Sequence, residues 1–439
     1  MLPLLTTAQM READAVAVEK RGVESLVHAA GTAVALEAKR MLGRVYGARV
    51  AVIVGPGLNG SDGRVAGSWL RLRGALVTVV DVAVQPTTLD GFDLVIDAAF
   101  GLGCSRPYAA PKIAPGTLVL AVDLVSGVDA DTGEVLGAPL AADVTVALGA
   151  FKPAHFDGPS SALVGELRLA GLGIVPEFAD GVMEDRDLAE LLRGDVNDHK
   201  WRHAVAVIAG SVLMPGAAEL AVRGALAGGA SMVQLASRGD IDGLVHVPPE
   251  VVRAGDDVDR RCRAVVAGPG LGPDASSWLA ERLTGIPAPV VLDADGLDRA
   301  LILAANVSDG RWVLTPHTAE FERLTGGVLP AMRFDAIRTL ARETGCVVLL
   351  KGPITVIADP RGRLRIVRSG TPALATAGSG DVLSGLIGAT IARGHEPFEA
   401  AALAAHLHGR AGARLATYAP ASELAGAVKA ILSSLSSLT

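Results

Sequence analysis

Short, strongly apolar segments alternate with longer amphipathic segments along the whole chain, and this alternation constrains the fold more than any other feature. In the first half the apolar segments are residues 49–54, 76–81, 94–97, 118–123 and 144–148. Strands rich in Val, Ile and Leu on both faces are typical of parallel sheets covered by helices on each side. Because 50% of the residues are hydrophobic but only 3% are aromatic, Ala, Val and Leu must fill the cores. The sequence therefore predicts an α/β protein built of three-layer αβα domains.

A second series of apolar segments follows, which indicates a second domain. Its predicted strands are residues 204–209, 232–236, 264–267, 290–293, 312–315, 346–351 and 355–358. Predicted helices are residues 7–20, 23–42, 64–73, 382–391, 399–418 and 421–435. A chain of 439 residues is too long for one ordinary core. The acidic stretch 177–194 lacks a strand pattern, so we expect one domain at 1–176, a linker at 177–194 and a second domain at 195–439.

Charge and composition exclude several classes of partner. The chain has 40 basic and 47 acidic residues, a net charge of −7, and no basic block, so we expect no nucleic-acid partner. No apolar stretch approaches the roughly 20 residues of a membrane span, and the first residues carry no signal pattern, so we expect no membrane partner. The three cysteines, Cys104, Cys262 and Cys346, are too far apart for a metal site. Free thiols are typical of a reducing compartment, which predicts a cytoplasmic location.

The segment Gly378-Ser379-Gly380-Asp381 precedes the predicted helix at 382–391. Glycines allow a tight turn, and amides at a helix N-terminus bind anions. An acid at the edge of such a site suggests phosphate chemistry in which Asp381 accepts a proton. The alternative is that Asp381 only caps the helix after a flexible loop.

Other strand ends of the second half carry matching groups. They are the glycine-rich stretch 268–272, Asp293-Ala294-Asp295-Gly296, Thr315-Pro316-His317 and Lys351-Gly352. Each is weak alone, since a lone histidine after a strand, such as His317, is more often an ordinary loop residue. A lysine ending an apolar strand is harder to explain, because lysine is almost never buried unpaired. Together they suit the phosphates of a nucleotide and an acceptor hydroxyl.

These motifs occur in one order along the second half. The order is Asp198-His199-Lys200, Ala209-Gly210-Ser211, Pro215-Gly216-Ala217-Ala218, 268–272, Asp293-Ala294-Asp295-Gly296, Leu314-Thr315-Pro316-His317, Glu320-Phe321, Leu350-Lys351-Gly352 and 375–381. In this order they resemble the ADP-dependent NAD(P)H-hydrate dehydratase family, a branch of the ribokinase-like fold, over nearly all of residues 195–415. Where that family has His-Lys-Gly and His-Pro-Gly-Glu, this chain has Trp201 and Thr318-Ala319.

The resemblance implies a role for specific residues. Nucleotide binding is implied for Lys351, Gly352, Pro353, Ile354, Thr355 and Gly380. Contact with the hydrated nicotinamide nucleotide is implied for Ala217, Gly270, His317 and Asp381. We expect Asp381 to be the catalytic base and Mg²⁺ to accompany ADP.

In the first half, Gly55-Pro56-Gly57-Leu58-Asn59-Gly60 follows a strand and has the spacing of a dinucleotide-binding loop. We reject a dehydrogenase because Asp62, at the predicted helix start, would repel a pyrophosphate. Residues 59–63 instead suggest a turn that presents oxygens. Oxygens of Asn59, Asp97 and Ser126 could coordinate a hard cation. Alternatively, aspartates at strand ends are caps or turn formers.

The first half resembles the NAD(P)H-hydrate epimerase domain from its N-terminal helices to Leu172-Gly173-Ile174, which implies a Rossmann-like fold. The resemblance implies a K⁺ site at Asn59, Asp97 and Ser126, with Asp123 as the catalytic acid/base. It also implies hydrate contacts from Asn59, Gly60, Ser61, Asp62, Gly101, Leu102, Gly103, Cys104, Ser105, Arg106, Pro107 and Asp123. Leu58 and Ser61 replace polar residues usual in the family, as Leu124-Val125 replace Ile-Pro. We expect Leu58 to slow epimerisation, unless the loop presents only backbone groups there.

Together the two resemblances predict a bifunctional enzyme that repairs damaged nicotinamide cofactors. It would interconvert the R and S forms of NAD(P)H hydrate and dehydrate the S form to NAD(P)H at the expense of ADP. Its expected partners are small molecules, NADHX, NADPHX and ADP, and a homo-oligomer is expected. The alternative is a ribokinase-like small-molecule kinase whose N-terminal domain is an inactive binding module.

Overall fold

The chain forms two compact units. The computed structural model describes residues 1–192, 199–254, 258–307 and 309–436. The N-terminal unit comprises residues 2–180 with 331–333, and the C-terminal unit comprises Met1 with 181–330 and 334–439. Each unit contains its own parallel sheet, as the sequence predicted.

The stretch expected to be a linker is largely structured. Strand β12 (Gly181–Val182) pairs with β21 (Leu364–Val367), and a 3₁₀ helix, η4, follows at Asp185–Leu192. Leu188 and Leu191 of that helix are buried in the core of the C-terminal unit. The linker interpretation is therefore corrected from residue 181 onward, because an amphipathic 3₁₀ helix covers apolar surface there. The rest of it, and the predicted domain start at 195, fall at residues 193–198, outside the described part of the chain.

The sheet of the N-terminal unit has six parallel strands. They are β2 (Arg49–Val54), β3 (Leu76–Asp81), β5 (Leu94–Ala98), β8 (Leu118–Val122), β10 (Val144–Leu148) and β11 (Glu166–Ala170). Their order is β11-β10-β8-β5-β2-β3, with every pairing parallel. The sequence predicted all of these strands except β11, whose alternating charges hid its strand pattern.

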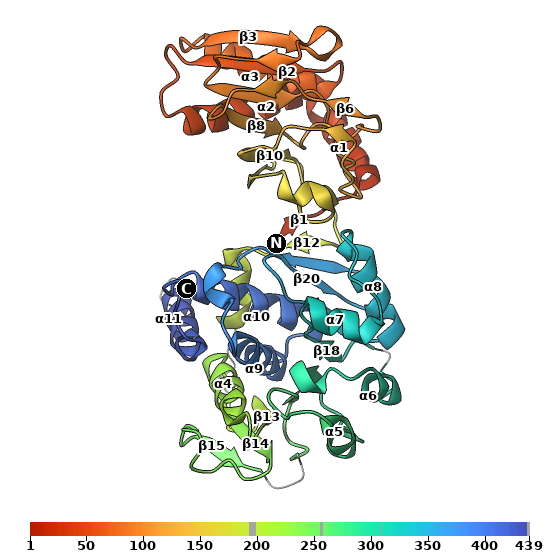
Figure 1. Cartoon of the computed structure of the whole chain (residues 1–439), viewed down its shortest axis with the longest axis vertical. Helices are drawn as coiled ribbons and strands as arrows, with labels where there is room; N and C mark the ends of the chain where they lie inside the picture. The colour runs from red at the N-terminus through yellow and green to blue at the C-terminus, as the bar shows by residue number, and fades with distance from the viewer. Residues whose placement is uncertain (193–198, 255–257, 308, 437–439) are drawn as a thin grey trace. The chain divides into compact units, whose positions relative to one another are not determined.

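Three helices belong to this unit, namely α1 (Thr7–Arg21), α2 (Val23–Leu42) and α3 (Leu58–Arg71). Helices α2 and α3 cover one face of the sheet, where Val50 and Val52 point (Figure 1). Ala51 and Ile53 point to the other face and join a cluster with Leu89 and Tyr108, from short strands and turns.

Helix α3 begins at Leu58, six residues earlier than predicted, so residues 59–63 are helical and do not form the predicted turn. The misleading signal was glycine, which is a poor helix former. A Cβ on Gly60 would lie 2.1 Å from the Gly55 oxygen, and one on Gly63 would lie 2.5 Å from the Ala98 Cβ. These glycines let the helix approach the sheet closely.

The C-terminal unit has a longer sheet. Its strands are β13 (Ala204–Ser211), β14 (Met232–Arg238), β15 (Val251–Arg253), β16 (Ala264–Ala267), β17 (Val290–Leu292), β18 (Trp312–Leu314), β19 (Val347–Leu350) and β20 (Thr355–Ala358), with β12 and β21. The order within the unit is β12-β21-β20-β19-β18-β17-β16-β13-β14-β15. Only the pairings β19–β20 and β20–β21 are antiparallel in the register of the described strands. The strands β15 and β21 were not predicted.

Helices cover both faces of this sheet. Figure 1 shows α4 (Pro215–Ala227), α9 (Ser379–Ala392) and α10 (Pro397–Gly412) on one side, with α11 (Leu424–Ser436) outside them. On the other side lie α5 (Ala275–Leu283), α6 (Arg299–Ala304), α7 (Thr318–Thr325) and α8 (Arg333–Thr344). The α/β fold with αβα layers is therefore confirmed. No helix within the described ranges is both long and apolar enough to cross a membrane.

Helices α4 and α9 touch backbone to backbone. A Cβ on Gly385 of α9 would lie 2.1 Å from the Ala221 oxygen and 2.7 Å from the Ala225 nitrogen of α4. A Cβ on Gly224 of α4 would lie 2.3 Å from the Val382 oxygen. This contact fixes the start of α9, where Gly380 and Asp381 lie.

We expect Gly385→Ala to lower the free energy of unfolding by about 1–3 kcal/mol, because the added methyl group must push two helix backbones apart. The matched control is Gly426→Ala in α11, where a Cβ would meet nothing within 4 Å. That change should be neutral or stabilise by up to about 1 kcal/mol. Urea denaturation of both variants checks this, and equal stabilities would contradict the close-contact interpretation.

Candidate active sites

A cavity of about 760 Å³ opens in the N-terminal unit. It lies beside the loops that follow β2 and β5, the neighbouring strands between which the strand order reverses. Ligands of doubly wound sheets bind at such a position. The predicted hydrate contacts that line it are Asn59, Asp62, Gly101, Leu102, Gly103, Cys104, Ser105, Arg106, Pro107 and Asp123. Gly60 and Ser61 do not line it, and Leu58 lies at its edge with 60% of its surface exposed.

Asp123 is held in this cavity by a buried network. It follows β8 with φ +67°, a backbone conformation rare for residues other than glycine. Its carboxylate forms an ion pair with Lys152 and accepts a hydrogen bond from the Leu148 N–H at 2.9 Å. Lys152 is fully buried and also donates to the Leu148 carbonyl at 2.8 Å. This arrangement compensates the charge of Asp123 and fixes its direction.

His155 supports the same network. Burial, and then the charge of Lys152, lower the pKa of His155 to about 4, so its ring is neutral. Its Nδ1 accepts from the Lys152 N–H at 3.0 Å, which leaves Nε2–H to donate to the Asp123 carbonyl at 2.8 Å. No sequence motif had indicated Lys152 or His155. The available signal was a lysine directly after an apolar strand, as at Lys351.

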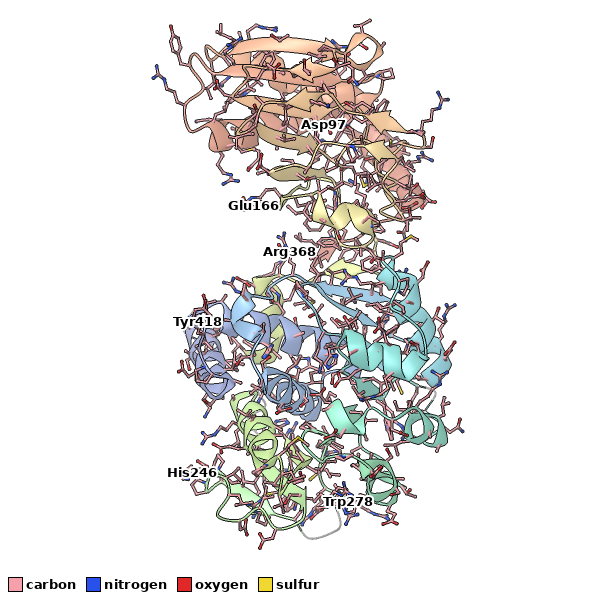
Figure 2. The ribbon with its side chains drawn as sticks, viewed as in Figure 1. Asp97, Glu166, His246, Trp278, Arg368 and Tyr418 are labelled. Atoms are coloured by element: carbon pink, nitrogen blue, oxygen red, sulfur yellow. The ribbon has the colours of Figure 1, made fainter. Side chains whose placement is uncertain are left out.

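Asp97 and Ser126 contact each other nearby, and Asn59 lies against the loop after β5, since a Cβ on Gly101 would be 3.4 Å from its side chain. Asp97 lies inside the N-terminal unit, at 1% exposure (Figure 2). Its carboxylate accepts from the Ser126 hydroxyl at 2.6 Å and the Ser126 N–H at 3.0 Å. Burial raises the pKa of Asp97, and no ion-pair partner for it occurs among the residues that the structure describes. The amide nitrogen of Asn59 is buried without a hydrogen-bond partner. These oxygen-rich side chains around an uncompensated acid fit a monovalent cation.

In the C-terminal unit, the strand order reverses between β13 and β16. Gly270, in the loop after β16, has φ +62°, and a Cβ there would lie 2.5 Å from the Cβ of Ala217 in α4. The structure therefore brings together two of the predicted hydrate contacts. The same loop is tied to the next strand end, because the Gly272 N–H donates to the Asp295 carboxylate at 2.8 Å.

A charged centre surrounds Lys351. Its ammonium lies 2.7 Å from an Asp293 oxygen and 3.6 Å from a Glu320 oxygen. A Cβ on Gly380 would lie 3.4 Å from this ammonium, so the start of α9 passes directly beside it. Asp381 is in the first turn of α9, as the sequence predicted for an acid at a helix N-terminus. Burial, and then the charge of Asp293, raise the pKa of Asp381 to about 7, against the opposing charge of Lys351.

The remaining predicted residues flank this centre. His317 caps α7, because its ring accepts from the Glu320 N–H at 3.3 Å while the Glu320 side chain accepts from the His317 N–H at 2.8 Å. Gly352, Pro353 and Ile354 form the turn between β19 and β20, and the Thr355 hydroxyl donates to the Gly352 carbonyl at 3.2 Å. Asp198 of the predicted motif lies outside the described residues.

Comparison with known proteins assigns both halves. A family described as NAD(P)H-hydrate dehydratase matches residues 205–433, and one described as YjeF-related protein N-terminus matches residues 23–91 and 82–154. A bifunctional NAD(P)H-hydrate repair enzyme of Mycobacterium leprae is 37% identical over 415 residues, which cover 84% of this chain and 84% of the relative. One of Synechocystis sp. is 35% identical over 426 residues, covering 83% of this chain and 81% of the relative.

Solved structures match the C-terminal unit. An ADP/ATP-dependent NAD(P)H-hydrate dehydratase from Bacillus subtilis, co-crystallised with ATP and Mg²⁺, has a TM-score of 0.50 and 28% identity, covering 56% of this chain and 97% of that chain. A ribokinase-like superfamily protein from Enterococcus faecalis has a TM-score of 0.52 and 21% identity, covering 60% and 98%. The second similarity shows the fold alone.

We expect Lys152→Met to lower the free energy of unfolding by about 3–5 kcal/mol, because it leaves the carboxylate of Asp123 buried without a counter-charge. The double variant Lys152→Met/Asp123→Asn removes both charges and should regain part of that loss. Thermal and denaturant unfolding of the two variants measure the coupling. A double variant no more stable than Lys152→Met would contradict the ion-pair explanation.

Proposed function

This chain belongs to the family of bifunctional NAD(P)H-hydrate repair enzymes, and from that premise we propose that each unit carries one of the two activities. The N-terminal unit interconverts the R and S forms of NAD(P)H hydrate. The C-terminal unit dehydrates the S form to NAD(P)H at the expense of ADP. The charged centre at Asp381 supports this assignment most strongly, because a buried acid whose pKa lies near 7 is suited to accept a proton at neutral pH.

Dehydration needs help because hydroxide is a poor leaving group. Transfer of a phosphoryl group from ADP to the ring hydroxyl, with AMP released, makes the oxygen a good leaving group. The ring-nitrogen electrons then expel phosphate to form a C6=N1 iminium ion, which loses a proton from C5 to restore the dihydropyridine. Asp381 accepts the hydroxyl proton, and the amides at the start of α9, with Gly380, stabilise charge on the phosphoryl group. Lys351 and the turn residues Gly352, Pro353, Ile354 and Thr355 bind the nucleotide.

The charged centre around Lys351 is suited to a metal ion. The carboxylates of Asp293, Asp295, Glu320 and Asp381 outnumber the single ammonium of Lys351, so they would hold Mg²⁺, which would supply positive charge to the nucleotide phosphates. The Bacillus subtilis dehydratase co-crystallised with ATP and Mg²⁺ supports nucleotide and Mg²⁺ use. Ala217, Gly270 and His317, which come from three different loops or helices, contact the hydrate beside Asp381.

In the N-terminal unit, the hydrate binds in the cavity after β2 and β5. Asp123 acts there as acid/base, held in place by Lys152. Asn59, Asp97 and Ser126 would hold K⁺, whose positive charge would compensate the buried carboxylate of Asp97. The proposed hydrate contacts are the cavity-lining members of the predicted set, which do not include Gly60 and Ser61.

A small-molecule kinase with an inactive N-terminal domain is not favoured, because relatives that cover both units are described as bifunctional repair enzymes. A homo-oligomeric state and a cytoplasmic location stay predictions. The test of the whole proposal is incubation of the protein with mixed-epimer hydrate, Mg²⁺ and ADP. Recovery of all the reduced cofactor with release of phosphate supports it, whereas a stable phosphorylated product contradicts it.

We expect Asp381→Asn to lower the dehydration rate by about 10²–10⁴ through loss of the base, while ADP affinity is retained or improved. Because the carboxylate is the active form, the rate constant of the unaltered enzyme should rise with pH and level off above about 7. Stopped-flow absorbance of the reduced cofactor across pH 5–9 measures both. Near-normal turnover by the variant would remove Asp381 from the mechanism.

Lys351→Ala should weaken ADP binding more than hydrate binding. The lost charge-assisted contact corresponds to about 1.5–3 kcal/mol, or about a tenfold to hundredfold change in Kd. Lys429→Ala, an exposed lysine of α11 in the same unit, is the control and should bind ADP normally. Calorimetry that shows unchanged ADP binding for Lys351→Ala would reassign Lys351 to a structural ion pair with Asp293.

A further inference from the structure

The cavity of the N-terminal unit contains an acid that the proposed epimerisation does not use. Asp14, on α1, lines the same cavity as Asp62, Asp123 and Lys152. No sequence motif pointed to it. Asp62 is only 6% exposed, yet within the described ranges neither the Asp14 nor the Asp62 side chain has a hydrogen bond or an ion pair. Two unpartnered carboxyl groups therefore face the space where the hydrate would bind.

The geometry of α1, α2 and α3 explains how these acids meet. Gly31 of α2 lies against α3, since a Cβ there would be 2.6 Å from the Asp62 oxygen of the backbone and 2.5 Å from the Val65 Cβ. This close packing holds α3 against α2. Residues of α1, α2 and α3 line the cavity, and Asp123 reaches it from the loop after β8.

Asp123 differs from Asp14 and Asp62 in how the charge of its carboxylate is compensated. The Asp123 carboxylate is compensated by Lys152 and the Leu148 N–H. Asp14 and Asp62 have no such partners, and burial raises the pKa of both, with Asp62 reaching about 8. The remaining charged side chains that line the cavity are Arg11 and Arg106. Asp62 therefore keeps its proton near neutral pH, because burial, and then the charges of Asp123 and Asp14, disfavour its ionised form.

Inversion at C6 of the hydrate needs one group that donates a proton and one group that accepts a proton. If the C6–O bond breaks, the departing hydroxyl must receive a proton and leave as water. The resulting C6=N1 iminium ion must then accept a solvent water on its opposite face, and that water must lose a proton. A single carboxyl group cannot serve both faces of the ring, so a second proton-transfer group is required.

We propose that Asp14, together with Asp62, is the second proton-transfer group of the epimerase site and works on the hydrate with Asp123. The Asp14/Asp62 pair donates its proton to the departing hydroxyl, and Asp123 takes the proton of the incoming water. In the opposite direction the two exchange roles, so no proton is gained or lost overall. This inference rests on the proposed epimerase function of the N-terminal unit.

The test uses the full chain with ADP, Mg²⁺ and mixed-epimer hydrate. The C-terminal unit consumes the S form directly, in a fast phase. The R form is consumed in a slow phase, because it must first be inverted to the S form. Asp14→Asn should lower the slow-phase rate by about 10²–10⁴, toward the rate without enzyme, and leave the fast phase unchanged. The matched control is Glu12→Gln, an exposed acid on the same helix, which should change neither phase. A slow phase of normal rate in Asp14→Asn would overturn the inference.

A second measurement follows the oxygen atom. In water enriched in the heavy oxygen isotope, each enzymatic inversion should place one labelled oxygen at C6. Inversion by the unaltered protein without label would overturn the C–O cleavage step. Partial recovery of the slow phase in Asp14→Glu would support a proton-transfer role over a structural one. If the unaltered protein itself shows no catalysed slow phase, the proposed epimerase function fails, which is a different outcome from failure of Asp14 alone.

Discussion

Both units depend on one constraint, the burial of a parallel sheet on both of its faces. The strands β2, β5 and β13 are almost entirely inaccessible to solvent, so no polar side chain can be placed along their faces without a partner. Chemistry is therefore confined to the strand ends. Where the strand order reverses, between β2 and β5 and between β13 and β16, neighbouring loops diverge and leave space for a ligand. The proposed epimerase site lies at the first position, and the proposed dehydratase site extends from the second to the ends of β17 and β19.

Buried lysine–aspartate pairs then set the charge of each site. Lys152 pairs with Asp123 in one unit, and Lys351 pairs with Asp293 in the other. Such a pair gives little net stability, because two charges lose their hydration, but it fixes a carboxylate in position. The acids beside each pair, Asp62 and Asp381, lack a full counter-charge, and their pKa values rise to about 8 and about 7. Each site thus holds a compensated carboxylate next to an acid that titrates near neutral pH.

Much of this architecture could be predicted from the sequence. The apolar runs fixed all the central strands, the glycine-rich segments marked the loops at the two reversal points, and Asp97, Asp123 and Asp381 stood at the expected strand or helix ends. These are local properties, since a run of Val and Ile or a glycine turn acts over a few neighbouring residues. The motifs of both halves also carried the family resemblance, which the comparisons confirm.

Only the tertiary structure decided which groups meet. Asp123 and Lys152 are 29 residues apart in the chain, and Lys351 and Asp293 are 58 apart, so no local pattern links them. The glycines of residues 60–63 indicated a loop, yet they belong to α3, because the helix lies too close to the sheet for a side chain. No sequence motif pointed to Asp14, which the fold places in a cavity. By itself, the sequence determined the sheets, their loops and the family. Long-range packing decided the partner of each charged group, and therefore which acids have no counter-charge and can transfer a proton.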